Sequence, residues 1–254
     1  MCTLYAFLRK LYNLAHLCSL SIDAIYILKK LSNIKHYMPF ILFMVLLMLT
    51  ACTPAPELRS EAFLHDTSLI TGDPCEAPCW QGLTPGDTAW GLAQDFVKNN
   101  ADYTIIDEVT QRRDRAGQIA FALKDGPQCC RILTNDGEVL SAILLLLSPD
   151  MQLGDVIDHY GEPTYLSGDA VTDNQATIAL VFPDIPMVTY IFAENLTDSE
   201  LSAASSVIGV MYLDTSGMAT LLQSENLYNW SGYGKLGSIV DGEFDITAQP
   251  QASE

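Results

Sequence analysis

The chain has 254 residues, of which 49% are apolar and 17% charged, and its formal net charge is −18. Residues 53–254 keep 30 of the 31 acidic but only 8 of the 13 basic side chains, a net charge of −22. Such a surface repels phosphate backbones, so the composition excludes a nucleic-acid-binding protein, and about 200 residues suffice for one large domain or two small ones.

An apolar stretch precedes the globular part of the chain. From Met38 to Cys52, 13 of 15 residues are apolar, lysines precede the stretch, and Thr53-Pro54-Ala55-Pro56 follows it. A membrane-spanning helix needs about 20 apolar residues, so this length predicts an export signal. A single spanning helix or a plain secretory signal is the alternative, in which Cys52 is an incidental thiol.

The end of this stretch, Leu49-Thr50-Ala51-Cys52, resembles the lipobox of bacterial lipoproteins. The resemblance implies that Cys52 becomes the first residue of the mature protein, with diacylglycerol on its thiol and an acyl chain on its amino group. Two or more chains give durable attachment, so the lipid alone would hold the protein on the extracytoplasmic face of the cell membrane. Residues 1–52 are then a signal peptide, and a translation start nearer Lys29 would give its basic lead an ordinary length.

Four cysteines remain after the leader, and their number predicts two disulfides in an oxidising compartment; they are Cys75, Cys79, Cys129 and Cys130. Neighbouring strand residues point to opposite faces, so Cys129 and Cys130 are not expected to face one loop together. We favour bridges from the Cys75–Cys79 loop to the strand that begins at Cys129, with a local Cys75–Cys79 pair as the alternative. A four-cysteine zinc site is a further alternative, although adjacent cysteines suit a tetrahedron poorly.

The segment 53–73 contains prolines, serines and threonines without sustained periodicity, and it is predicted to be a flexible tether. Docking of Phe63 and Leu64 on the domain would shorten that tether. The stretch from Pro74 to Trp80 holds two prolines and two cysteines and is expected to form a stiff loop, with Trp80 filling one end of the core.

Residues 74–146 are expected to form one helix followed by a four-stranded antiparallel meander. Apolar residues recur at helical spacing from Ala89 to Val97, and the helix should end near Asn99-Asn100. The apolar period then changes to two, and turn sequences such as Asp125-Gly126 and Asn135-Asp136-Gly137 separate the apolar runs. These patterns predict strands over residues 103–109, 118–124, 129–134 and 138–147.

Residues 147–223 repeat the same order. Leu147-Ser148-Pro149-Asp150 matches Leu83-Thr84-Pro85-Gly86 at an offset of 64 residues, and a helix from Leu153 to Tyr160 follows, closed by Gly161-Glu162-Pro163. Further strands are predicted over 164–167, 176–182, 187–193 and 207–214, and a short helix over 218–223. The predicted fold is therefore α+β, a tandem repeat of helix and meander with the helices packed on one face of the sheet. Coincidence between two generic helix starts is the alternative.

A helix opened by Thr-Pro-Gly and closed by Tyr-Gly-x-Pro, with antiparallel strands after it, resembles the units of the SmpA/OmlA lipoproteins and of the beta-lactamase inhibitor proteins. The latter carry two such units in tandem. The resemblance covers residues 83–214 and implies a protein-binding fold without catalytic residues. Two positions depart from the pattern, because Asn99-Asn100-Ala101-Asp102 replaces the expected Gly-x-Pro and Asp150 replaces the turn glycine.

Residues 224–254 are expected to form a partly disordered extension. Its aromatic residues Tyr228, Trp230 and Tyr233 are candidates for an exposed binding face, although covering the open end of a sheet is the favoured role for them. The alternating carboxylates from Asp241 to Asp245 make too short a run for a calcium loop, so an acidic turn is expected there. No metal and no cofactor besides the lipid is predicted.

Candidate catalytic groups are sparse. Nucleophilic catalysis needs a base held by a third group, and neither His65, in the tether, nor His159, on the second helix, has such a context. Arginines at positions 112, 113 and 115 form a basic hairpin tip that is expected to be solvated. The chain is accordingly predicted not to be an enzyme.

Together these observations favour a lipid-anchored protein of the bacterial envelope whose curved antiparallel sheet binds another protein or an envelope polymer. An envelope or extracellular hydrolase is the alternative, and it would be recognised by Asp and Glu side chains clustered in one cleft. A small-solute receptor is disfavoured because such receptors need two lobes of alternating strands and helices.

Overall fold

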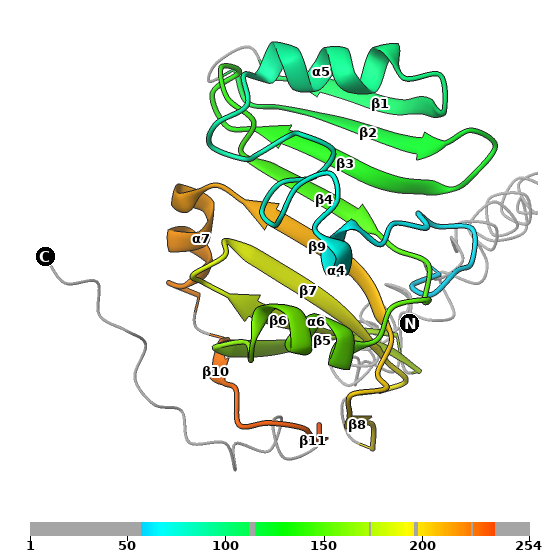
Figure 1. The fold of residues 1–254 in the computed structure, drawn as a ribbon, viewed down its shortest axis with the longest axis vertical. Coiled ribbons are helices and arrows are strands. Elements are labelled where there is room, and N and C mark those ends of the chain that lie inside the picture. The colour runs from blue at the N-terminus through cyan, green and yellow to red at the C-terminus, as the bar shows by residue number, and fades with distance from the viewer. Residues whose placement is uncertain (1–56, 112–114, 173, 196–197, 225, 237–254) are drawn as a thin grey trace, which may run out of the picture. The chain divides into compact units, whose positions relative to one another are not determined.

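One antiparallel sheet dominates the computed structural model, which describes residues 57–111, 115–172, 174–195, 198–224 and 226–236. Its strands lie in the order β1-β2-β3-β4-β9-β7-β6-β5-β10 (Figure 1). Their bounds are Tyr103–Thr110 (β1), Gly117–Leu123 (β2), Gln128–Thr134 (β3), Ala142–Leu146 (β4), Tyr165–Thr172 (β5), Gln175–Phe182 (β6), Met187–Ala193 (β7), Val207–Leu213 (β9) and Tyr228–Asn229 (β10). A separate two-stranded ladder pairs β8 (Glu200–Leu201) with β11 (Gly234–Lys235).

The two meanders meet through their last strands. β4 and β9 pair antiparallel, from Ala142 opposite Leu213 to Leu146 opposite Gly209. A Cβ atom at Gly209 would lie 2.8 Å from the carbonyl oxygen of Leu145, closer than side-chain carbons normally come to a backbone oxygen. Glycine in a strand interior often marks such a close backbone approach, and here it permits the two meanders to form one continuous sheet.

Four helices accompany the sheet in the described residues: α4 (Ser68–Thr71), α5 (Trp90–Asn99), α6 (Leu153–Tyr160) and α7 (Thr215–Leu221). The side chains of Gln152 and Asp155 form a capping box at the start of α6. Gly161 ends the helix with a φ of 81°, a left-handed value that suits glycine. None of the described helices is long and apolar enough to span a membrane.

Two apolar clusters stabilise the sheet. The larger one collects Trp80 and the buried residues of α5 and α6 with inward side chains of the strands, among them Ile119, Ile143 and Ile178. The smaller one lies around Met218 of α7 and contains Ala142, Val181, Val188 and Leu213. Because neighbours in a strand point to opposite faces, Ala142 and Ile143 place the two clusters on opposite sides of the sheet.

The predicted elements agree closely with the observed ones. The α+β class is confirmed, since a large antiparallel sheet accompanies a few short helices. Eight strands and the helices α5, α6 and α7 lie within a few residues of the predicted ranges. The predicted fourth strand over 138–147 is shorter, because residues 138–141 instead bond to the segment before α5, for example through Leu140 N–H and the Thr88 carbonyl oxygen.

The N-terminal segment differs from the predicted tether. Phe63, Leu64 and Leu69 are buried in the larger cluster, and α4 forms where a flexible segment was expected. The backbone N–H of Leu64 donates to the Leu146 carbonyl oxygen at 3.2 Å. Burial of three large apolar side chains outweighs the entropy that a free tether would keep, so the segment from Phe63 onward belongs to the folded body.

The C-terminal extension also packs on the body as far as it is described. β10 pairs with the edge strand β5, with Tyr228 opposite Leu166 and Asn229 opposite Tyr165. Leu236 is 1% exposed, and its N–H donates to the Ser199 carbonyl oxygen. We call residues 226–236 the C-terminal strap; residues 237–254, including the acidic turn expected at 241–245, lie outside the described residues.

Candidate functional site

The disulfide pattern corrects the favoured prediction. Cys75 pairs with Cys79, and Cys129 pairs with its neighbour Cys130. The local Cys75–Cys79 alternative is therefore the observed one, and no bridge joins that loop to β3.

A β-bulge explains why two adjacent cysteines can pair. Cys130 lies opposite Phe121, the next pair in the register is Gln128 with Ala122, and Cys129 is the extra residue between them. An extra residue interrupts the alternation of side chains and re-aims one of them. The prediction assumed a regular strand, and the amino-acid sequence carries no local signal of this bulge.

A Ser–His–Asp group lies where the N-terminal segment meets the end of β4. The Nδ1 atom of His65 is 2.7 Å from Oδ2 of Asp150 and 2.9 Å from Oγ of Ser148. The Ser148 hydroxyl in turn donates to Asp150 Oδ2 at 2.5 Å. A cavity of about 90 Å³ adjoins these side chains and is also lined by Ile70 and Met151. We call His65, Ser148 and Asp150 the docking triad.

The geometry of the docking triad differs from that of a nucleophilic relay. In a relay the serine hydroxyl bonds one imidazole nitrogen while the carboxylate holds the other. Here Ser148 and Asp150 both contact Nδ1, and the serine proton is directed to the carboxylate. The hydrogen bond from Asp150 raises the pKa of His65, and hydrogen bonds from Ser148 and then His65 lower the pKa of Asp150. The arrangement favours a charge-assisted clamp between two segments.

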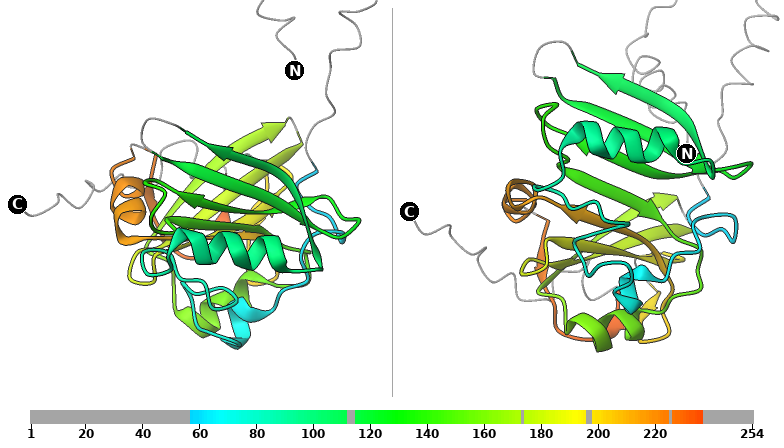
Figure 2. Two further views of the ribbon diagram at one scale, coloured as in Figure 1. Left: turned by 90° about the horizontal axis from the view of Figure 1, so that it is seen from above. Right: turned by 45° about the horizontal axis from the view of Figure 1, so that its top comes forward.

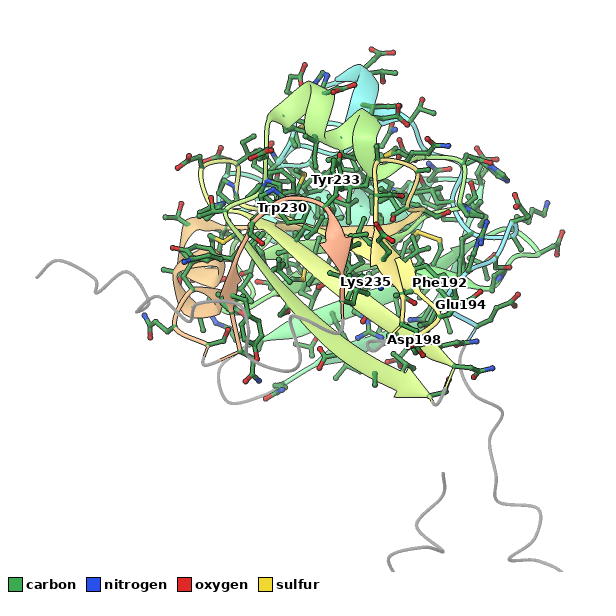
Figure 3. All side chains as sticks on the ribbon, turned by 90° about the horizontal axis from the view of Figure 1, so that it is seen from below. Phe192, Glu194, Asp198, Trp230, Tyr233 and Lys235 are labelled. Atoms are coloured by element: carbon green, nitrogen blue, oxygen red, sulfur yellow. A yellow bond between two sulfur atoms is a disulfide. The ribbon has the colours of Figure 1, made fainter. Side chains whose placement is uncertain are left out.

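The aromatic residues of the C-terminal strap occupy different environments. Trp230 and Tyr233 make an edge-to-face contact with ring centres 5.8 Å apart, and Figure 3 shows them close together on the strap that leads to β11. Tyr228 and Trp230 are half-buried against the larger cluster, whereas Tyr233 is 46% exposed. Burial raises the pKa of Tyr233, and the carboxylates of Asp158 and Glu162 raise it further. The structure thus brings two of the three candidates together and leaves one of them open to solvent.

A broad face of the sheet points away from the larger cluster, and we call it the open face. The strand register carries one row of its side chains across eight strands: Asp107, Ala120, Arg131, Leu144, Met211, Val188, Val181 and Tyr165. The α7 cluster covers the end of the row near Val181 and Val188. Several large apolar side chains on the rest of the face are only half-buried: Leu133, Leu144, Leu146, Tyr190, Phe192 and Met211.

Arg131 stands near the middle of the open face, between Ala120 and Leu144. Its Nε atom is buried and has no hydrogen-bond partner among the described residues. Next to this region a shallow pocket of about 290 Å³ lies over the row Val109, Gln118 and Leu133, with Gln111 and Asn135 at its rim. The sequence pattern placed Arg131 on a strand but gave no reason to single it out.

The remaining predicted groups are dispersed. His159 Nε2 lies 3.1 Å from Glu76 Oε2, and Arg115 forms an exposed ion pair with Glu138 at 2.7 Å. Residues 112 and 113 of the basic tip lie outside the described residues, as does Cys52. Within the described ranges no three His, Cys, Asp or Glu side chains are grouped to hold a metal ion.

Sequence reasoning missed the docking triad because its members are more than 80 residues apart, His65 on one side and Ser148 with Asp150 on the other. Ser148 and Asp150 were noticed only as part of the repeated helix start. No protein-family model, no curated protein and no solved structure matches this chain.

Proposed function

We propose that this protein is a lipid-anchored, non-enzymatic binding protein of the bacterial envelope, held on the extracytoplasmic face of the cell membrane through Cys52. The lipobox sequence Leu49-Thr50-Ala51-Cys52 supports the anchor. The open face carries the binding function, because its large side chains stay half-buried in a body that otherwise buries its apolar residues well.

The composition of the open face suits a protein partner. Interfaces are enriched in Met, Arg and aromatic residues relative to other surfaces, and Met211, Arg131, Tyr190 and Phe192 all lie on this face. An arginine whose Nε lacks a partner gains a hydrogen bond when a carboxylate or carbonyl group is placed over it. An envelope polymer remains the second kind of partner that the sequence suggested.

The hydrolase alternative is less well supported by the geometry. A serine, a histidine and an aspartate do meet beside a cavity, yet both Ser148 and Asp150 contact the same imidazole nitrogen. That arrangement holds His65 in place without making Ser148 a nucleophile. A binding role for the open face needs no such group.

We also infer that the two helix-and-meander units arose by duplication and that α5 and α6 pack on the same face. Two equivalent backbone contacts support this. Ala89, before α5, bridges Val139 before β4, and Gln152, before α6, bridges Ser206 before β9. The N–H groups of Trp90 and Leu153, the first residues of α5 and α6, then bond to Glu138 and Ser205 in the same way. An experimental structure in which these bridges are not equivalent would contradict the duplication.

Two experiments test the function separately. Radiolabelled palmitate should label the wild-type protein, and Cys52→Ala should remain unlabelled and leave the membrane fraction. For binding, a photo-crosslinking amino acid at Leu144, on the open face, should capture a partner in membranes. The matched control places it at Leu92, which is 64% exposed on α5. Equal capture at both positions, or none at Leu144, would contradict binding through the open face.

A further inference from the structure

The strand β1 forms one end of the nine-stranded sheet and exposes an unusual amount of apolar surface. Seven of its eight residues are exposed, whereas β2 beside it is largely buried. Only six large apolar side chains are exposed in the described residues, and three of them lie on β1: Ile105 at 38%, Ile106 at 52% and Val109 at 42%. These side chains are concentrated on the one long strand that ends the sheet (Figure 2).

The outer edge of β1 also offers backbone hydrogen-bonding groups. β1 pairs with β2 on one side, and among the described residues no strand pairs with it on the other. Gln111 donates its N–H to the Ala116 carbonyl oxygen, so the N–H of its neighbour Thr110 points away from β2. The opposite end of the sheet differs, because the C-terminal strap adds β10 to the edge of β5.

Edge strands are usually protected against pairing, and β1 carries part of that protection. A bulge lies between Ile105 and Asp107, and the exposed carboxylates of Asp107 and Glu108 follow it. Bulges and charges commonly blunt an edge, but a protected edge does not also display three large apolar side chains. The combination selects which strand can pair instead of preventing all pairing.

The charges at this edge define the partner. Asp102 and Asp107 are exposed carboxylates, and Glu108 is held by Lys98 of α5 at 2.8 Å. A second copy of this chain would bring Asp107 and Glu108 of both copies close together, and each copy carries a large net negative charge. A cationic polypeptide avoids both penalties.

We infer that the outer edge of β1 binds an extended segment of another polypeptide, in which apolar residues alternate with lysine or arginine, as an added strand of the sheet. Main-chain hydrogen bonds then give affinity, while alternate side chains give specificity. This inference deepens the proposed binding function, on which it rests, by naming the class of partner. A side chain of the added strand beside Val109 would also reach the pocket over Gln118 and Leu133.

A peptide-binding experiment tests the inference with the purified full chain. The probe is a fluorescent peptide of alternating lysine and valine, matched to the eight residues of β1. Its analogue with glutamate in place of lysine tests charge, and its analogue with N-methylated backbone amides tests hydrogen bonding. Fluorescence anisotropy should show binding of the first peptide and at least about tenfold weaker binding of both analogues.

Protein variants locate the site. The double substitution Ile106→Ser and Val109→Ser should weaken binding at least about tenfold, since it removes both exposed apolar contacts. Leu92→Ser is the matched control on α5 and should bind as the wild type does. Thr110→Pro removes an outward N–H and should weaken binding, with Thr110→Ala as its control.

Several results would overturn the inference. They are equal binding by the double variant, equal binding of the N-methylated peptide, and self-association of the chain without peptide binding. A partner crosslinked at Leu144 with no peptide binding would remove the β1 site and leave the proposed function intact. Peptide binding without any crosslink at Leu144 would instead support β1 and remove the open face.

Discussion

At the scale of single residues, Trp80 shows how packing and one polar contact combine. The sequence predicted that Trp80 fills one end of the core, and its 1% exposure confirms this. Phe96, Tyr103 and Phe121 surround it with ring centres 5.7, 6.4 and 6.3 Å away. The indole N–H donates to Asp66 Oδ2 at 2.6 Å, and the other carboxylate oxygen accepts the N–H of Ser68 at 2.7 Å. Asp66 thus joins the N-terminal segment to the aromatic core.

The substitution Asp66→Ala should destabilise the protein by about 1–3 kcal/mol, because it leaves the buried indole N–H of Trp80 without an acceptor. Chemical denaturation followed by tryptophan fluorescence measures the loss. Asp95→Ala, at an exposed carboxylate of α5, is the matched control and should change the free energy of unfolding by less than about 0.5 kcal/mol. Equal effects of the two substitutions would show that the Asp66 contact contributes little.

At the scale of elements, the strands and their turns could be predicted and their irregularities could not. Asn135-Asp136-Gly137 is a turn as predicted, since Asp136 Oδ1 accepts the N–H groups of Glu138 and Val139. These hydrogen bonds lower the pKa of Asp136. The bulge at Cys129 escaped prediction because it depends on how β3 pairs with β2, and no local periodicity encodes that pairing. The same holds for the bulge in β1 that helps to define the proposed peptide site.

Removal of the Cys75–Cys79 bridge, by Cys75→Ser with Cys79→Ser, should cost about 2 kcal/mol, because so short a loop gains little from closure. Equilibrium unfolding of the double variant measures this cost. Digestion and mass spectrometry of the unreduced wild type should return one peptide that contains Cys129 linked to Cys130 and a second that contains Cys75 linked to Cys79. A peptide that joins the two regions would restore the pairing first favoured from the sequence.

At the scale of the whole molecule, long-range contacts unite parts that look independent in the sequence. β4 pairs with β9, the strap adds β10 to β5, and Leu64 bridges Leu147. Each contact joins segments more than 60 residues apart, and local patterns specify a strand without naming its partner. The docking of Leu64 has a consequence for the proposed anchor. Only about ten residues separate Cys52 from the docked segment, so the tether reaches at most ~35 Å instead of the length that the sequence suggested.

The docking triad should make that attachment depend on pH. The pKa of His65 is raised by its hydrogen bond to Asp150, with Glu61 also contributing, so its stabilisation is complete below the ordinary histidine value near 6.5 and disappears as the pH rises through the raised pKa. Asp150, with a lowered pKa, contributes above its ordinary value of 3.8 and loses this contribution only in stronger acid. The clamp is therefore strongest in mild acid. The Leu64 amide, corrected for its intrinsic exchange rate, should be better protected from hydrogen exchange at about pH 6 than at about pH 8.5. His65→Ala should abolish the difference, whereas His159→Ala, at the separate contact with Glu76, should preserve it. Equal protection at both pH values in the wild type would mean that apolar burial of Phe63 and Leu64 alone holds the segment.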